Sequence, residues 1–210
     1  ALSHRAVNHP YLKALASGKL PDLRWALADF ARQYYGYSAH FPRFLTQTIS
    51  QLTEPVDRAA LMSNLTEERG IYEQEELDEL AAVGVDPDWI VGIPHPQLFS
   101  RFSRAMGVEL GEPTSDAIQV ISWREMFLDV LSGGQAQAIG ALGLGTESIV
   151  STMYQNFLPA LDQLDIPPRD AVFFPLHAMV DDRHQETLME IATRPAESEQ
   201  GRRDLEQGMH

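Results

Sequence analysis

The 210-residue sequence predicts an all-α protein, a single-domain bundle of about seven helices. Apolar residues recur at steps of three and four along most of the chain, which places them on one face of a helix. No stretch alternates apolar and polar residues long enough to require a β-strand. A chain of this length is expected to form one domain with a sizeable hydrophobic core.

The first apolar stripe runs from Leu23 to Phe44 and includes several aromatic residues. Pro42 falls inside this stripe, so a kink or break is expected near Phe41. A second helix is predicted to begin near Pro55 and to end towards Gly70, because glycine is a common C-terminal stop.

The following segment, residues 70–94, is acidic at its start and rich in turn residues at its end. This composition predicts a short helix followed by an extended excursion. Further helices are expected over residues 95–106, 114–131, 135–161 and 175–191. Residues 1–194 are therefore predicted to form the helical domain, and the polar residues 195–210 a frayed tail.

Charge and composition exclude several functions. The chain has 16 Lys plus Arg against 30 Asp plus Glu, a formal net charge of −14, so neither nucleic acid nor an anionic membrane is an expected partner. It has no cysteine, which excludes disulfides, thiolate zinc sites, iron–sulfur clusters and a cysteine nucleophile. No apolar run approaches the length of a membrane span and no secretory signal is visible, so we expect a cytoplasmic protein.

The strongest local signal for a metal site is the set His177, Asp181 and His184. At about 100° per residue, steps of four and seven return to within about 40° of the starting direction, so the three side chains share one helix face. Two imidazoles and a carboxylate suit a divalent metal such as iron or zinc. The alternative is a solvated polar face, because these residue types are common on surfaces.

Other signals are weaker when taken singly. Glu147 lies at the margin of an apolar stripe, where a carboxylate must be paired, protonated, coordinated or turned towards water. Three nearby glycines do not form a phosphate loop, since no strand precedes them and no lysine follows. They predict instead the close approach of another helix or of a ligand; they are Gly140, Gly143 and Gly145.

Four motifs occur in order along the chain and resemble those of the haem-oxygenase-like diiron oxidases and oxygenases, relatives of the TenA and PqqC proteins. They are Asn64-Leu65-x-x-Glu68-x-Gly70, His95-x-x-Leu98-Phe99-x-Arg101-Phe102, Glu147, and Phe173-Phe174-x-Leu176-His177-x3-Asp181-x2-His184. The resemblance covers most of the chain, from His9 to about Ile191. It implies two Fe(II) ions at the centre of the bundle, O₂ as co-substrate and six metal ligands: Glu68, His95, Glu147, His177, Asp181 and His184.

The resemblance also implies a function. The expected protein is a non-haem diiron oxygenase or oxidase that oxidises a small amine, amino acid or fatty-acid-like substrate, by N-oxygenation or by oxidative C–C cleavage. An external electron donor and a homodimer are further expectations. Arg101, Arg124 and Arg183 are candidate anchors for a substrate carboxylate, with surface charges as the alternative.

Departures from the family pattern leave alternatives open. The spacing between Glu68 and His95 is longer than expected because residues 72–94 are interposed, so Glu67 or a residue of this insertion could replace Glu68. The branch of the family that makes p-aminobenzoate from its own tyrosine and lysine is disfavoured, since no lysine follows Lys19. A TenA-type thiaminase would need a cysteine nucleophile.

Two other classes of function remain as alternatives. The first is a metal-free TenA/PqqC-like helical protein whose cavity binds a small aromatic ligand. The second is an enzyme that has lost its metal site and is retained as a partner subunit. Stabilisation of the fold by Fe(II) separates the diiron enzyme from both.

Overall fold

The computed structural model describes residues 6–110 and 116–210, except for the side chains at positions 180–182. Within these residues the fold is all-α and contains no strand, which confirms the predicted class. The elements, with η marking 3₁₀ and π segments, are α1 (Pro10–Ala16), α2 (Leu23–Ser38), α3 (Phe41–Gln51), α4 (Pro55–Glu67), α5 (Gln74–Ala82), η1 (Pro87–Trp89), α6 (His95–Ala105), α7 (Ile118–Leu131), α8 (Gln135–Ile139), η3 (Gly140–Glu147), α9 (Ser148–Tyr154), α10 (Leu158–Asp162), α11 (Pro168–Ala171), α12 (Phe173–Ala196) and α13 (Glu199–Met209).

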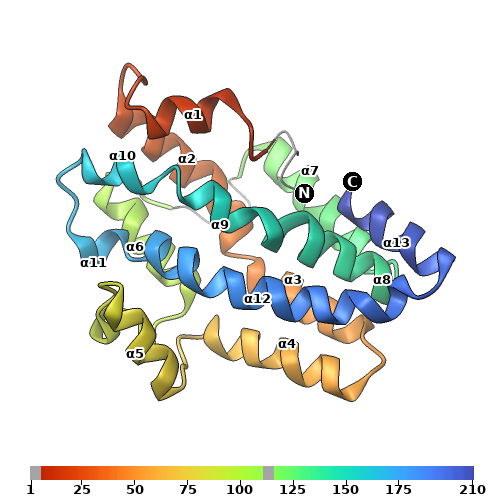
Figure 1. Cartoon of the computed structure of the whole chain (residues 1–210). Coiled ribbons are helices and arrows are strands. Elements are labelled where there is room, and N and C mark those ends of the chain that lie inside the picture. Colours follow the sequence, from red (N-terminus) through yellow and green to blue (C-terminus); the bar gives the residue numbers. More distant parts are fainter. Residues whose placement is uncertain (1–5, 111–115) are drawn as a thin grey trace.

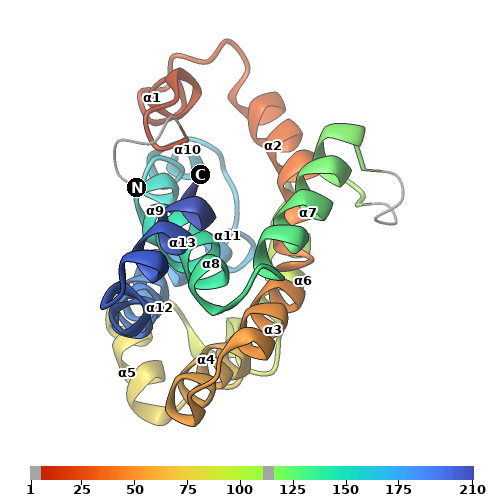
Figure 2. The ribbon, with the colours of Figure 1, turned by 90° about the vertical axis from the view of Figure 1, so that its right-hand side faces the viewer.

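The long helix α12 crosses the middle of the molecule, with α8 and α9 on one side and α4 on the other (Figure 1). Seen along the bundle, the helices form two walls (Figure 2). One wall contains α8, α9, α12 and α13, the other contains α2, α3, α6 and α7, and α4 and α5 lie across one end. No helix in the described ranges is both long and apolar enough to cross a membrane.

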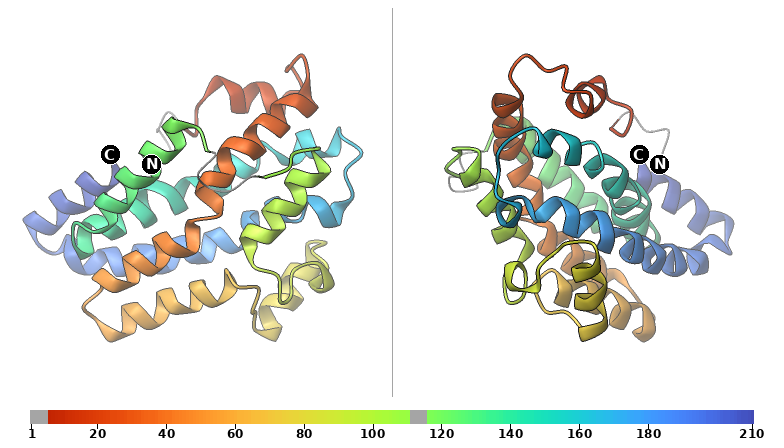
Figure 3. Two further views of the ribbon diagram at one scale, coloured as in Figure 1. Left: turned by 180° about the vertical axis from the view of Figure 1, so that it is seen from behind. Right: turned by 60° about the vertical axis from the view of Figure 1, so that its left-hand side comes forward.

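The break predicted near Phe41 is confirmed. Helix α2 ends at Ser38 and α3 begins at Phe41, with Pro42 in its first turn (Figure 3, left). Proline has no N–H to donate, so it fits the first turn of a new helix but not the interior of a continuing one.

The segment after α4 also follows the prediction of a short helix and an excursion. Gly70 ends the α4 region with a positive φ of 80°, and α5 and η1 follow. The excursion then returns to its starting point, because the Gly92 N–H donates to the Gly70 carbonyl at 2.8 Å. The His95 N–H donates to the Glu68 carbonyl at 3.0 Å. Two residues far apart in the sequence, Glu68 and His95, are thereby placed side by side.

The prediction of one helix over residues 135–161 is wrong. This region consists of α8, the π-helix η3, α9 and α10. Glycines weaken the α-helical hydrogen-bonding pattern, and helix α13 lies against them so closely that a Cβ at Gly140 would overlap the Leu205 carbonyl. The close approach of another helix that the glycines predicted is therefore confirmed.

The predicted frayed tail is also wrong. Residues 199–209 form helix α13, whose N-terminus is capped by Ser198 accepting a hydrogen bond from the Gly201 N–H at 2.9 Å. Leu205 is buried, and α13 packs on α8 and η3. The polar composition does not reveal this helix, because its packing on α8 and η3 depends on few residues, among them Leu205 and Gly208, which lies against the Gln137 carbonyl of α8. Helix α12 likewise extends beyond the expected limits of 175–191.

Candidate metal centre

Three of the predicted ligands meet in the interior. Glu68 at the end of α4, His95 at the start of α6 and His177 in α12 are all buried, and each offers one ligand atom within 4.8 Å of the others. The Nδ1 atom of His95 lies 3.0 Å from Oε1 of Glu68. His177 Nδ1 donates to the Phe173 carbonyl at 2.7 Å, which leaves Nε2 of His177 available as a ligand. One carboxylate and two imidazoles can hold a divalent metal here.

The protonation states of His177 and Glu68 suit metal binding. Burial, with the neighbouring His95, lowers the pKa of His177 to about 3, so this imidazole is neutral near physiological pH. Burial alone would raise the pKa of Glu68, but His95 and the other two histidines lower it overall, so this carboxyl is ionised. Neutral imidazole and ionised carboxylate are the forms that bind metals.

Glu147 and His184 adjoin this group of three. Glu147 is 4% exposed, and its Oε2 atom has no hydrogen-bond partner among the described residues. The nearest positive partner is His184, whose Nδ1 lies 3.9 Å from this oxygen, beyond hydrogen-bonding distance. Burial and the charge of Glu68 raise the pKa of Glu147 to about 7, against the opposing effect of His184. A buried carboxylate oxygen without a hydrogen bond, beside a histidine, fits a site that holds a cation.

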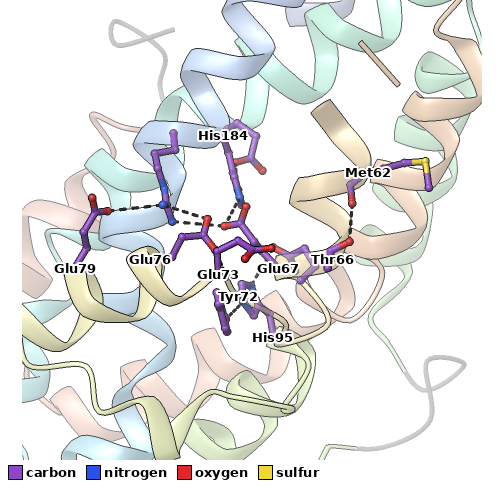
Figure 4. Close-up of polar contacts among 12 residues, drawn as sticks. Met62, Thr66, Glu67, Tyr72, Glu73, Glu76, Glu79, His95 and His184 are labelled. Carbon is purple, nitrogen blue, oxygen red and sulfur yellow. Dashed lines mark hydrogen bonds and ion pairs between the residues drawn. The ribbon is translucent and has the colours of Figure 1, made fainter. Parts of the chain in front are cut away.

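The two adjacent glutamates at the end of α4 contact different histidines. Glu68 faces His95, whereas Oε2 of Glu67 lies 3.3 Å from Nε2 of His184 (Figure 4). Burial would lower the pKa of His184, but the hydrogen bond to Glu67 and the charge of Glu147 raise it overall. The structure therefore favours Glu68 over Glu67 for the group with His95, and gives Glu67 a second role beside His184.

Arg183 fixes Glu67 from the outer side. Its guanidinium lies 3.6 Å from Glu67, 3.2 Å from Glu76 and 3.7 Å from Glu79, and the last two residues belong to α5 (Figure 4). The insertion is thereby attached to α12 directly beside the candidate centre.

Tyr72, which no sequence pattern selects, contributes to the site from the start of the insertion. Its hydroxyl lies 2.7 Å from Nε2 of His95 (Figure 4). Burial, with Glu68 and Glu67 nearby, raises the pKa of Tyr72, so the phenol stays protonated. This contact holds Nε2 of His95 and directs Nδ1 towards Glu68. Tyr72 is a single aromatic residue in an acidic segment, so no local sequence pattern indicates a role for it. Its role follows from the tertiary structure, in which the chain returns to Glu68 after the insertion.

We expect Tyr72→Phe to weaken metal binding by about tenfold to a hundredfold, because hydrogen-bonding partners of metal-ligating histidines typically contribute this much. The variant keeps the ring and its packing but leaves Nε2 of the buried His95 without this partner, so the metal-free protein should melt at a somewhat lower temperature and remain folded. Fe(II) and Co(II) titrations under anaerobic conditions measure the effect, with Tyr35→Phe as a matched tyrosine control outside the centre. Unchanged affinity in Tyr72→Phe would contradict the positioning role.

Glu147 is the last residue of the π-helix η3. π-Helical turns are rare and occur often at functional sites, because the wider turn displaces a side chain from its α-helical direction. Thr146 donates to the Leu142 carbonyl at 2.5 Å and Ser148 to the Leu144 carbonyl at 2.5 Å, so hydroxyl groups on both sides of Glu147 support the irregular backbone. The irregular turn thus sets the position of the unpaired carboxylate.

A small space of about 20 Å³ lies between Glu68, His95, Glu147 and His177. This volume holds about one water-sized particle. Most of its other walls are apolar or aromatic. Five of the six predicted ligands therefore lie at or beside one buried space, while the side chain of the sixth, Asp181, falls outside the part of the chain that the structure describes.

The three arginines considered as carboxylate anchors have other partners. Arg124 pairs with Asp116 at 2.7 Å, and Arg101 donates to the carbonyls of Trp89 and Arg169. Arg183 binds the three glutamates described above. These contacts favour structural roles for all three.

The fold and site define a class, a helical bundle with buried carboxylates and histidines that could hold a metal ion, and sequence comparison identifies the family. A sequence model described as "iron-containing redox enzyme" matches residues 28–210, and the chain belongs to this family. A solved structure of a TenA homolog from Pseudomonas syringae pv. tomato str. DC3000 has the same fold, with a TM-score of 0.72 and 14% identity over 98% of this chain and 80% of that one. No curated protein matches the sequence.

Proposed function

We propose that this protein is a non-haem diiron enzyme that uses O₂ to oxidise a small organic substrate. The observation that carries the proposal is the buried side chain of Glu147, whose Oε2 atom has no hydrogen-bond partner among the described residues and lies beside His184 and the group of Glu68, His95 and His177. Leaving such a group unpaired is costly unless a cation neutralises it. Membership of a family of iron-containing redox enzymes supports iron as that cation.

In this proposal Glu68, His95 and His177 would hold one iron and Glu147 and His184 would help to hold the second, with Asp181 as the sixth ligand that the family resemblance implies. Iron bound here would supply the electrons and the open coordination positions that O₂ reduction requires. Three carboxylates carry less negative charge than two ferrous ions carry positive charge, so the site retains a net positive charge for an anion or a solvent ligand. The family resemblance extends the proposal to a homodimer served by an external electron donor.

The residues of the chain prepare this site in three ways. Burial keeps His177 neutral and therefore able to bind metal. Tyr72 holds the ring of His95, and Glu67 holds the ring of His184. Phe41, Val150 and Phe173 line the small space and exclude bulk water from it.

The proposal is tested by adding Fe(II) to the metal-free protein under anaerobic conditions, counting iron per chain and following the visible spectrum on mixing with O₂. Two irons per chain and an O₂-dependent spectral change are expected. Absence of bound iron and of any spectral change would overturn the proposal and favour a metal-free ligand-binding bundle.

We also expect Fe(II) to raise the melting temperature of the protein. A ligand present at a hundred times its dissociation constant stabilises the folded state by about 2.7 kcal/mol, which corresponds to about 5–10 °C for a chain of this size. Anaerobic circular dichroism melts measure the shift, with Mg(II) as a control that prefers all-oxygen sites. An equal shift in His177→Ala would show that iron stabilises the fold from elsewhere.

A further inference from the structure

A second, larger cavity of about 400 Å³ lies between the two walls of the bundle. Its lining side chains come from α2, α7, η3 and α9. This volume is within the range of sites that bind small molecules. Four aromatic side chains line it, namely Phe30, Tyr34, Tyr37 and Trp123.

The cavity opens at the surface and adjoins the small space of the candidate metal centre. Gln33 and Gln119 line it and are exposed to solvent, so they mark its mouth. Tyr37 and Val150 line both this cavity and the small space between the candidate metal ligands. A molecule bound in the cavity would therefore have one end next to Tyr37 and Val150, beside the centre.

The chemistry of the walls selects for an uncharged occupant. None of the described side chains that line the cavity is an acid, a base or a histidine. The hydroxyl of Tyr34 lies 2.8 Å from that of Tyr154, and the Thr146 hydroxyl donates to the Leu142 carbonyl. A charged ligand would lose hydration without gaining a partner of opposite charge among the described lining residues. Aromatic rings, by contrast, gain stacked and edge-to-face contacts with aromatic neighbours.

We propose that this cavity binds an uncharged aromatic substrate and presents its oxidisable group to the metal centre past Tyr37 and Val150. The inference rests on the proposed function for the oxidation itself. It narrows the substrate class to neutral aromatic molecules, such as aryl amines, which are unprotonated near neutral pH. Fatty acids and amino acids carry charges that these walls do not match.

The test compares probes that share a ring system and differ in charge. We would measure binding of 1-naphthylamine, 1-naphthoate and octanoate near neutral pH, by calorimetry, to the metal-free protein and to the Fe(II)-loaded protein without O₂. The metal-free protein is expected to bind 1-naphthylamine more tightly than either anion by about tenfold or more. Equal affinity for 1-naphthylamine and 1-naphthoate would overturn the inference.

Variants of the cavity test whether 1-naphthylamine binds there. Trp123→Ala should weaken 1-naphthylamine binding by about tenfold, whereas Trp25→Ala, at a tryptophan that is 65% exposed, should not. Gln119→Lys places a positive charge at the exposed mouth of the cavity, where the fold tolerates it. This variant should reduce the preference for 1-naphthylamine over 1-naphthoate. Unchanged affinity in Trp123→Ala, or an unchanged preference in Gln119→Lys, would exclude this cavity as the binding site.

The diiron function and the neutral aromatic substrate can be disproved independently of each other. Iron binding without a preference for 1-naphthylamine would leave the metal centre intact and overturn the substrate inference. Selective 1-naphthylamine binding by a protein that takes up no iron would support the cavity assignment and overturn the diiron function.

Discussion

Replacing His177 by alanine is expected to abolish tight iron binding while the chain remains helical. His177 lies in α12, is held by its Nδ1 contact with the Phe173 carbonyl, and faces Glu68 and His95. Removing a direct ligand should exceed the tenfold-to-hundredfold loss typical of groups that only orient one. We expect fewer irons per chain and loss of the O₂-dependent spectral change.

Iron content after gel filtration and far-ultraviolet circular dichroism together measure this effect. His40→Ala is the matched control, because His40 also lies in the bundle but outside the group around Glu68. The control should keep its full iron content. Full occupancy in His177→Ala or in Glu147→Ala would count against the assigned ligands.

Replacing Glu147 by glutamine is expected to have opposite effects on the metal-free fold and on iron binding. The pKa of Glu147 is raised from 4.5 to about 7 in the folded state, because of burial and the nearby Glu68. Between these two pH values the unfolded chain has lost a proton that the folded chain keeps, so the free energy of unfolding falls as pH rises. The loss from this one group amounts to about 3 kcal/mol above pH 7.

Glutamine keeps the shape of the side chain but does not ionise, so Glu147→Gln should remove this loss. The metal-free variant is expected to be more stable than the wild type at pH 8, and the difference should shrink towards pH 4.5. The same variant should bind iron far more weakly, since a neutral amide replaces a carboxylate ligand. At this position the carboxylate would favour iron binding and lower the stability of the metal-free protein.

Urea unfolding at pH 5 and pH 8 with a chelator present, together with anaerobic Fe(II) titration, tests both effects. Glu190→Gln, on the exposed surface of α12, is the control and should alter neither. A Glu147→Gln variant that is less stable than the wild type at pH 8 would show that the carboxylate is paired in the metal-free protein.

The local features of the fold could be predicted from sequence because they depend on neighbouring residues. Periodic apolar residues predicted the helices, Pro42 the break before α3, and Gly70 the end of the α4 region. The same local periodicity placed His177 and His184 on one face of a helix. The family resemblance added Glu68, His95 and Glu147, which no local pattern could connect.

Two parts of the fold were predicted wrongly for related reasons. The interrupted helix over residues 135–161 and the ordered α13 depend on each other, because the glycines of η3 accept the backbone of α13 at close range. Neither segment has a local pattern that reveals the partner. The polar composition of α13 is typical of a frayed tail, but its few small and apolar residues match a surface formed by distant segments.

The amino-acid sequence is enough to establish the helical class, the absence of thiolate chemistry and the spacing of the α12 histidines. The tertiary structure is needed to show that the long insertion returns its end to Glu68, that Glu67 and Glu68 contact different histidines, and that Tyr72 holds His95. Helix formation and the side chains that share a helix face depend on residues only a few positions apart, and can therefore be predicted from sequence. The centre depends on contacts between segments up to 117 residues apart, as between Glu67 and His184, which form only when the whole bundle packs.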